Sequence, residues 1–341
     1  MLDGFFDVDN ILAKLDSKGD FLQRLNETVD WEEFRPLLHE VRNKIRKNNS
    51  GRRPFDEVMM FKILVLQSLF NLSDETTERM ILDRLTFRRY LGLTLSSRVP
   101  DATTIWLFRD ALGQLGLVKK LFDMFDLQLA GKGFEARRGS IIDATMVEVP
   151  RQKISKDEKQ EIEEKGEVED WSEETSRQKD TDAKWTKKND TPYFGYKNHV
   201  NVDVEHKFIR KYAVTDASVH DSRLLDVLLD YSNSNSEVYA DSAYRSRKNL
   251  DMLEILGFRE RIHRKAHRNR PLSEREKQGN ATKSKTRARV EHVFGVQLKL
   301  AGSLLMRCIG ILRAEAVIGL RNIAYNMSRL VTLCRLRPST V

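Results

Sequence analysis

The sequence predicts an α/β protein in which a mixed sheet flanked by helices follows an all-helical N-terminal domain. Apolar residues recur at helical spacing before residue 135, and β-branched, apolar runs begin after residue 138. From there to the end of the chain, short strands alternate with helices, which is typical of a sheet covered by helices. We therefore expect a helical domain over residues 1–135 and a sheet domain over residues 136–341, with a charged insertion at about 151–190.

Length and composition limit the class of protein. A chain of 341 residues that is 40% hydrophobic can bury a sizeable core. Its two cysteines, Cys308 and Cys334, form no CxxC pair, so neither a disulfide framework nor a zinc finger is indicated. The stretch VMMFKILVLQSLF is short and contains Lys62, which favours a buried helix over a membrane span. With no signal-peptide pattern at the start, we expect a cytosolic protein that does not contact membranes.

The positive charge of the chain is concentrated near its C-terminus. The formal net charge is +8, yet the segment from Arg259 to Val341 holds 19 lysines and arginines against 5 acids. Ten of these basic residues lie between Arg264 and Arg289. Clustered cations attract phosphate backbones by counterion release, so the cluster indicates a nucleic-acid partner, with a solvated basic face as the alternative.

Helical signals follow one another through the first domain. WEEFRPLLHEVRNKIRK carries an apolar stripe, and Pro54 is expected to open a helix that runs through Leu69. Ser73 and Asp101 are suitable N-caps for the next helices. A helix-turn-helix-like DNA-binding unit and a plain helical bundle explain this pattern equally well. Four arginines lie on or beside these helices: Arg84, Arg88, Arg89 and Arg109.

Strand signals open the second domain. SIIDATMVEV is a buried strand by composition, and residues 151–190 have the mixed charge of an exposed loop. YFGYKNHVNVD and KFIRKYAVTD are expected to form two strands joined by a VEH turn.

Helices and strands alternate in the remainder. DSRLLDVLLDYS is expected to be a helix, SEVYAD a strand and YRSRKNLDMLEILG a helix that ends at Gly257. RERIHRK is a further strand candidate. A helix covering Glu291 and a last helix over residues 312–334 complete the order β-β-β-α-β-α-β-α.

Three acids occupy special places in this order. Asp143 lies within the first strand, Asp241 ends SEVYAD, and Glu291 lies on a late helix. A charge inside a strand is costly unless it is paired or metal-bound, and strand ends of open sheets expose functional side chains. Carboxylates gathered by the fold would repel one another unless a hard cation such as Mg²⁺ or Mn²⁺ lay between them.

Each acid also has a simpler explanation. Asp143 could be an edge-strand residue, Asp241 a helix N-cap, and Glu291 an i,i+4 partner of Arg287. Two further acids compete with Asp241 for the second position, namely Asp203 and Asp221.

The motifs resemble those of insertion-sequence transposases of the DDE type. Four motifs occur in the order found in the insertion-sequence-five and insertion-sequence-four-like transposases, a group typified by insertion sequence five: IIDATMVEV, GYKNHVNVD, YADSAY and RARVEHVFG. FDEVMMFKILVLQSLFNLSDETTERMILDRLTFRRYLGL and VPDATTIWLFRDAL are similar to the N-terminal domain of that group. The resemblance implies an RNase H-like catalytic domain in which Asp143, Asp241 and Glu291 bind the metal ions and carry out catalysis.

The late helix matches the family pattern Tyr-x2-Arg-x3-Glu-x6-Lys in part. Arg287 and Glu291 match it, whereas Ser284 replaces the tyrosine and Lys299 falls one residue late. On an ideal helix Arg287 and Glu291 share a face, and Lys299 is turned about 80° away from Glu291. The 49 residues between Asp241 and Glu291 leave little room for the β-rich insertion of some related transposases.

The resemblance implies a bacterial, nucleoid-associated enzyme that acts on double-stranded DNA with Mg²⁺ or Mn²⁺, two ions in all. It would cut the ends of its insertion sequence with water and join the resulting 3′-hydroxyls to target DNA, with no covalent protein intermediate. Bringing two ends together implies a homodimer. A metal-dependent RNase H-like nuclease without strand transfer, and a catalytically inactive DNA-binding derivative, are the alternatives.

Candidate DNA-binding residues surround the three acids. Arg287 is expected to hold a phosphate near the scissile bond, and Lys299 either a more distant phosphate or only solvent. Lys197 and Asn198, in the GYKNH stretch, are expected to position DNA or to support Asp143. The neighbouring histidines, His199 and His220, are expected to be hydrogen-bonded structural residues.

Overall fold

The computed structural model describes residues 7–42, 53–166, 168–188, 190–268, 270–301 and 305–336. The chain divides into two compact units, Met1–Gln128 with Ile323–Val341, and Leu129–Asn322. The division falls inside two helices, α8 (Leu117–Gly131) and α14 (Ile311–Leu336), and so differs from a single boundary between residues 135 and 136. Within the described ranges, no helix has the length and apolar character needed to cross a membrane.

The first unit is helical. Asp56, rather than Pro54, caps α4, because its carboxylate accepts a hydrogen bond from the backbone N–H of Met59. Ser73 and Asp101 cap α5 and α7 as predicted, and residues 43–47 of the predicted amphipathic helix lie outside the described residues. The elements are α1 (Asp7–Ser17), α2 (Phe21–Thr28), η1 (Trp31–Phe34), α3 (Arg35–His39), η2 (Glu40–Arg42), α4 (Glu57–Phe70), α5 (Asp74–Asp83), α6 (Leu85–Leu91) and α7 (Ala102–Gln114).

The four arginines of this unit all have partners within it. Arg88 is buried and donates to the carbonyl oxygens of the turn after α6, and Arg109 forms an ion pair with Asp74 at 2.7 Å. Arg89 pairs with Asp16, and Arg84 lies over the ring of Phe87. These contacts stabilise the helical packing, and a DNA-binding role for the unit stays a prediction.

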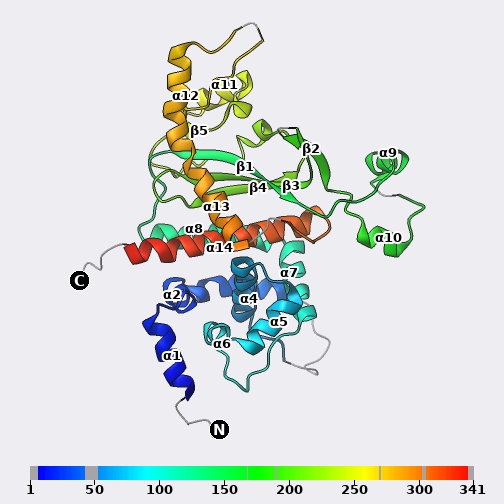
Figure 1. The fold of residues 1–341 in the computed structure, drawn as a ribbon, viewed down its shortest axis with the longest axis vertical. Coiled ribbons are helices and arrows are strands. Elements are labelled where there is room, and N and C mark those ends of the chain that lie inside the picture. The colour runs from blue at the N-terminus through cyan, green and yellow to red at the C-terminus, as the bar shows by residue number, and fades with distance from the viewer. Residues whose placement is uncertain are drawn as a thin grey trace. The chain divides into compact units, whose positions relative to one another are not determined.

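The second unit is built on a mixed sheet with the order β2-β3-β1-β5-β6, with β4 paired to β3 (Figure 1). The central strand β1 is antiparallel to β3 and parallel to β5, and β5 is parallel to β6. Three antiparallel strands continued by two parallel ones give the RNase H-like arrangement that the resemblance implied. The strands are β1 (Ser140–Glu148), β2 (Lys184–Lys188), β3 (Thr191–Asp203), β4 (Ile209–Asp216), β5 (Glu237–Tyr239) and β6 (Arg259–Glu260).

The glycine of the GYKNH stretch has a structural reason. Gly195 has φ +145°, and a Cβ there would overlap the carbonyl oxygen of Val147 on the neighbouring strand. Only glycine therefore allows β1 and β3 to approach at this point. Gly195 is the last residue of the pairing, opposite Glu148.

Two predictions of local structure differ from the fold. Residues 151–190 are not one loop, because serine caps start α9 (Lys156–Lys165) and α10 (Glu173–Gln178), and β2 pairs with β3. DSRLLDVLLDYS forms only a 3-10 turn, η3 (Asp221–Leu224), followed by further turns. Side chains from elsewhere take the carbonyl oxygens that a helix would use: Asn249 donates to Ser222 and Asn201 to Leu228.

The late helices lie against the parallel part of the sheet. α12 (Glu274–Arg287) contacts β5, and α13 (Arg289–Ala301) contacts β1. The predicted single helix through Arg287 and Glu291 is therefore two helices that meet at Ala288. α11 (Arg247–Ile255) ends just before Gly257, at φ +76°, close to the predicted end. β6 is shorter than the RERIHRK stretch predicted for it.

Candidate active site

Strand register brings Asp143 and Asp241 together. In the parallel pair of β1 and β5, Ile141 lies opposite Tyr239. Asp143 follows Ile141 by two residues within β1, and Asp241 follows Tyr239 by two residues, just beyond the end of β5, so the backbone register puts the two acids level. Neighbouring strands are about 4.8 Å apart, so the two carboxylates face the same small volume.

Asp143 is a partly desolvated carboxylate. Its side chain is 16% exposed, and its Oδ1 accepts from the backbone N–H of Ala144 at 2.9 Å. Burial raises the pKa of Asp143 above its ordinary value, while the Ala144 N–H and the Arg287 guanidinium act in the opposite direction. The charge of Asp241 contributes to the raised pKa, which agrees with the closeness that the register implies.

Arg287 links Asp143 to Glu291. Its Nη1 donates to Oδ2 of Asp143 at 2.8 Å, and its Nη2 lies 3.7 Å from Oε1 of Glu291. The predicted common face of Arg287 and Glu291 is therefore confirmed, although the helix is interrupted between them. The Nε of Arg287 is buried and has no hydrogen-bond partner among the described residues. That nitrogen is a donor suited to an anionic oxygen.

Arg287 contacts both Asp143 and Glu291, but the three acids do not form one metal-binding cluster. Among the described residues, no group of three or more histidine, cysteine, aspartate or glutamate side chains is placed to hold one metal ion. Asp143 and Asp241 nevertheless bring two carboxylates, which are hard oxygen donors, to level positions of the backbone. A cationic guanidinium already pairs with Asp143, so a divalent cation bound at this carboxylate would have to displace that contact.

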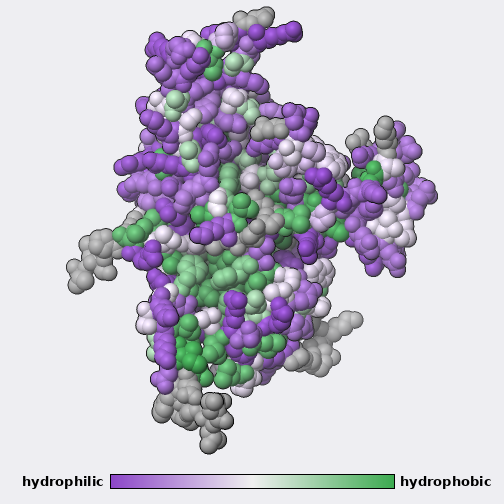
Figure 2. Space-filling view, in the orientation of Figure 1, coloured by the Kyte–Doolittle hydropathy of each residue, from purple (hydrophilic) through white to green (hydrophobic). Residues whose placement is uncertain are grey.

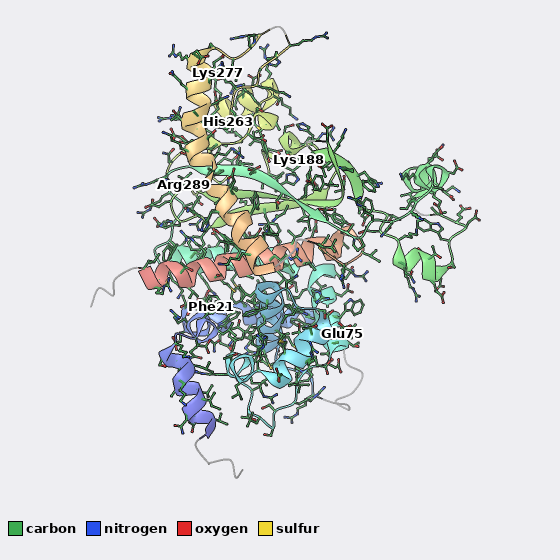
Figure 3. The ribbon with its side chains drawn as sticks, in the orientation of Figure 1. Phe21, Glu75, Lys188, His263, Lys277 and Arg289 are labelled. Carbon is green, nitrogen blue, oxygen red and sulfur yellow. The ribbon has the colours of Figure 1, made fainter. Side chains whose placement is uncertain are left out.

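His263 lies level with Asp241, although no sequence motif marks it. The register of β5 with β6, in which Val238 lies opposite Glu260, puts His263 level with Asp241. The backbone N–H of His263 donates to Ala240 O at 3.1 Å, and the ring Nε2 lies 3.3 Å from the Oγ of Ser284 on α12. Figure 3 labels His263 next to the ribbon of α12. Burial and the nearby Arg287 lower the pKa of His263. Only the pairing of β6 reveals this position, because the residue lies in a basic stretch.

The structure gives Lys197 and Asn198 roles inside the protein. Both side chains are buried on β3. The Nζ of Lys197 donates to Asp221 at 2.8 Å and to Val219 O at 2.7 Å, while Asn198 exchanges amide hydrogen bonds with Asn322. Both side chains are thus engaged inside the protein, on the strand that pairs with β1, and a contact of either one with DNA stays a prediction.

The two alternative acids, Asp203 and Asp221, have partners within the protein. Asp203 is fully buried at the end of β3, where its carboxylate accepts from the N–H groups of His206 and Phe208. Asp221 pairs with Lys197 at the start of η3. Asp241 also has a structural contact, because its Oδ1 accepts from the N–H of Ala243 at 2.8 Å as the N-cap of η4 (Ser242–Tyr244). The backbone register with β1, rather than a free carboxylate, therefore favours Asp241 over its rivals.

The histidines next to the acids fit structural roles. Burial lowers the pKa of His199 to about 4, so its ring is neutral near pH 7, with Nε2 hydrogen-bonded to Thr215. His220 caps η3 through its Nδ1. Lys299 is exposed on α13, where either DNA or solvent can reach it.

The burial of Asp143 predicts a dependence of stability on pH. A folded-state pKa raised above the ordinary 3.8 means that the neutral form stabilises the fold, and that this contribution is lost as pH rises through the raised pKa. We therefore expect Asp143→Asn to raise the free energy of unfolding at about pH 7, by on the order of 1 kcal/mol. The gain should fade as the pH falls toward 3.8.

Urea unfolding of wild type and variant at successive pH values measures this difference. A variant that is less stable than wild type at neutral pH would mean that the ion pair with Arg287 outweighs the burial of Asp143.

Comparison with known proteins places this geometry in a family. Residues 135–327 match the family model described as Transposase DDE domain, and residues 9–111 match the model described as Transposase domain (DUF772). Among solved structures, a piggyBac transposase in a synaptic complex with hairpin DNA is similar with a TM-score of 0.47 and 13% identity, over 94% of this chain and 77% of that chain. The first family model spans more than half of the chain and contains all three acids of the candidate site. This chain therefore belongs to the transposase DDE domain family.

Proposed function

We propose that this transposase, of the insertion-sequence-five group, cuts the ends of its own element and joins the free 3′-hydroxyls to target DNA. The proposal is supported by the register of β1 with β5, which puts Asp143 level with Asp241 just beyond β5, and by Arg287, which reaches from α12 to Asp143. Acids at this position lie in the part of the chain that matches the DDE model.

Asp143 and Asp241 would hold Mg²⁺ or Mn²⁺, and Glu291 would complete the ligand set. When bound, two such ions supply activation of the attacking oxygen and stabilisation of the leaving oxygen. The N–H of Ala144 orients the Asp143 carboxylate. Arg287 would transfer its donors from Asp143 to a DNA phosphate, which its unpartnered Nε is suited to meet.

In the first reaction the oxygen of a water molecule forms a bond to phosphorus at the element's end, and the bond from phosphorus to the 3′-oxygen breaks. The 3′-oxygen leaves as a hydroxyl after taking up a proton. In the second reaction that hydroxyl oxygen attacks a phosphodiester of the target and displaces the next 3′-oxygen. Both are in-line displacements at phosphorus, so one site serves for both.

The partners of the proposed enzyme are double-stranded DNA at the element ends and at the target. Lys299 is retained as a contact to a more distant phosphate, because it is exposed on the helix that carries Glu291. Since two ends must be joined together, we propose that a homodimer assembles on them.

A strand-transfer assay tests the proposal. Duplexes with the terminal sequences that flank the chain's reading frame would be supplied uncut and pre-cut, with Mg²⁺ and a supercoiled target. Joining of the pre-cut end to the target supports a transposase. Cleavage of the uncut end without joining would support the nuclease alternative, and binding with neither reaction would support a DNA-binding derivative.

The substitution Glu291→Gln distinguishes two roles for Glu291, namely a metal ligand and a surface ion-pair partner of Arg287. Glu291 is 66% exposed, so the substitution should leave the melting temperature unchanged. If it completes the ligand set, end cleavage should fall on the order of 10²-fold or more, with a greater need for Mg²⁺. Glu274→Gln, at an exposed glutamate on α12, is the matched control. Equal activity of the two variants would leave Glu291 with only its contact to Arg287.

A further inference from the structure

A strongly basic pocket lies at the end of the sheet, apart from the acids. It has a volume of about 410 Å³ and lies between the start of α11, the segment after β6 and the start of α12. Its wall includes five cationic side chains: Arg245, Arg247, Arg264, Lys265 and Arg270. Among the described residues that line it, Glu276 is the only carboxylate.

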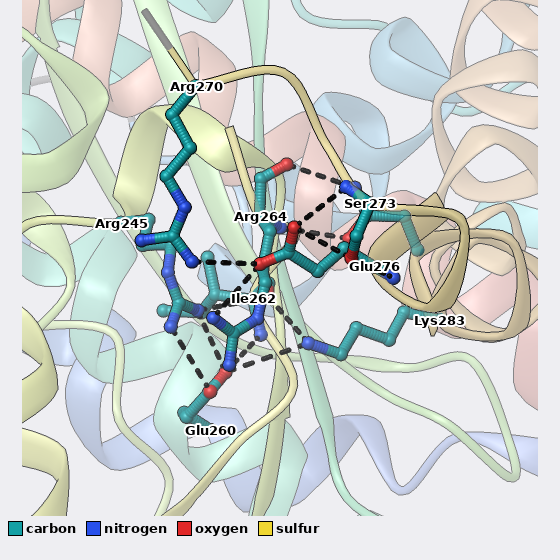
Figure 4. A network of polar contacts seen from close by, with 9 residues as sticks. Arg245, Glu260, Ile262, Arg264, Arg270, Ser273, Glu276 and Lys283 are labelled. Carbon is teal, nitrogen blue, oxygen red and sulfur yellow. Dashed lines mark hydrogen bonds and ion pairs between the residues drawn. The ribbon is translucent and has the colours of Figure 1, made fainter. Parts of the chain in front are cut away.

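Glu276 cannot neutralise this wall. Its Oε2 already accepts from the N–H and the hydroxyl of Ser273 in the capping box of α12. The same carboxylate faces Arg264 at 3.4 Å and Arg270 at 3.8 Å (Figure 4). Each guanidinium has five N–H donors, so most of those on Arg264 and Arg270 are left for another acceptor. Because its wall carries more cations than carboxylates, the pocket favours an anionic ligand.

Internal contacts hold the floor of the pocket in place. Arg245 and Lys283 both lie near the carboxylate of Glu260 and donate to the carbonyl oxygen of Ile262. Asn280 on α12 exchanges two hydrogen bonds with the backbone of Arg264. These contacts fix the segment after β6 against α12 and preorganise the positions of the arginines.

The pocket is linked to the candidate active site by two short connections. Arg245 follows Asp241 by a single turn, η4 (Ser242–Tyr244). Arg264 immediately follows His263, which is level with Asp241 in the sheet. Two walls of the pocket therefore begin a few residues after the ends of the parallel strands β5 and β6, close in sequence to Asp241 and His263. The surrounding surface over α12 is hydrophilic (Figure 2).

We propose that this pocket binds a backbone phosphate of the DNA strand that is held at Asp143 and Asp241, a few nucleotides from the scissile bond. The inference rests on the proposed function, and it adds a second anchor that sets the register of the strand. Arg264 and Arg270 are its main donors, and Arg245 lines its floor. These are positioning residues, because they contact a phosphate that does not react.

The test measures how binding of a short mixed-sequence DNA duplex depends on salt. Wild type is compared with R264Q/R270Q and with R275Q/K277Q, which removes the same charge from α12 outside the pocket. For each phosphate that the protein no longer neutralises, the slope of log Kobs against log salt should become shallower by about 0.9. We expect R264Q/R270Q to lower the slope by about 1 and the affinity on the order of 10-fold, well beyond the effect of R275Q/K277Q.

Other arms of the experiment distinguish the possible failures. R264K/R270K should restore most of the slope, and equal melting temperatures exclude misfolding. If R264Q/R270Q and R275Q/K277Q gave the same salt slope, the proposal would be overturned. It would also be overturned if R264Q/R270Q lost binding of inorganic phosphate but bound DNA as wild type does. If the variants changed the salt slope as expected but the protein never cut element ends, the result would instead count against the proposed function.

Discussion

Asp143→Asn should reduce cleavage of the element's ends by at least ~10³-fold while DNA binding stays within about two-fold of wild type. The asparagine keeps the shape of the side chain and the hydrogen bond from the Ala144 N–H. It removes the negative charge that a divalent cation requires from its ligand. The rate is measured on labelled duplexes that carry the terminal sequences flanking the reading frame.

Asp241→Asn should have a similar effect, and the double variant should lose little more, because residues that act as one unit are not additive. Glu148→Gln is the matched control, since Glu148 is on the same strand but five residues further along, on the opposite face. If Asp143→Asn cut DNA at the rate of Glu148→Gln, Asp143 would be a structural carboxylate and the assignment of the site would be wrong.

Arg210→Met should lower the free energy of unfolding by about 3–5 kcal/mol, because it leaves a buried charge without its counterion. The Nε of Arg210 lies 3.3 Å from Oδ2 of Asp203, and the two side chains are only 3% and 0% exposed. The Nη2 of Arg210 also donates to the carbonyl oxygen of Phe134 at 2.6 Å. Asp203 in turn holds the turn between β3 and β4 through the N–H groups of His206 and Phe208.

Arg177→Met is the control for this prediction. Arg177 pairs with Glu173 at 3.0 Å, but its side chain is 78% exposed, so the decrease in stability should stay below about 1 kcal/mol. Both variants are compared by chemical denaturation at neutral pH. A decrease in Arg210→Met as small as in Arg177→Met would mean that Asp203 is satisfied by backbone N–H groups alone.

Local patterns determined much of the fold. The run SIIDATMVEV is a strand because β-branched residues pack well on both sides of a covered sheet, and it became β1. Ser73 and Asp101 start helices because their side chains accept from free backbone N–H groups one turn ahead. These signals depend on neighbours within a few residues, so the sequence alone was sufficient to locate these three elements.

Elements whose form depends on distant partners were not predictable in this way. DSRLLDVLLDYS has the apolar spacing of a helix, yet Asn201 and Asn249 bind its carbonyl oxygens and hold it in turns. Lys197 and Asn198 have the residue types of DNA contacts, but β3 turns them toward partners inside the protein.

For the candidate site, the sequence determined which acids stand at a strand, at a strand end and on a late helix. Strand pairing decided that Asp143, Asp241 and His263 are level, because register depends on hydrogen bonds between segments far apart in the chain. The tertiary structure also decided that Arg287 reaches across 144 residues to Asp143. The contact between Arg287 and Asp143 depends on packing. Removing a carboxylate from water costs free energy, and this cost arises only once the fold has covered Asp143.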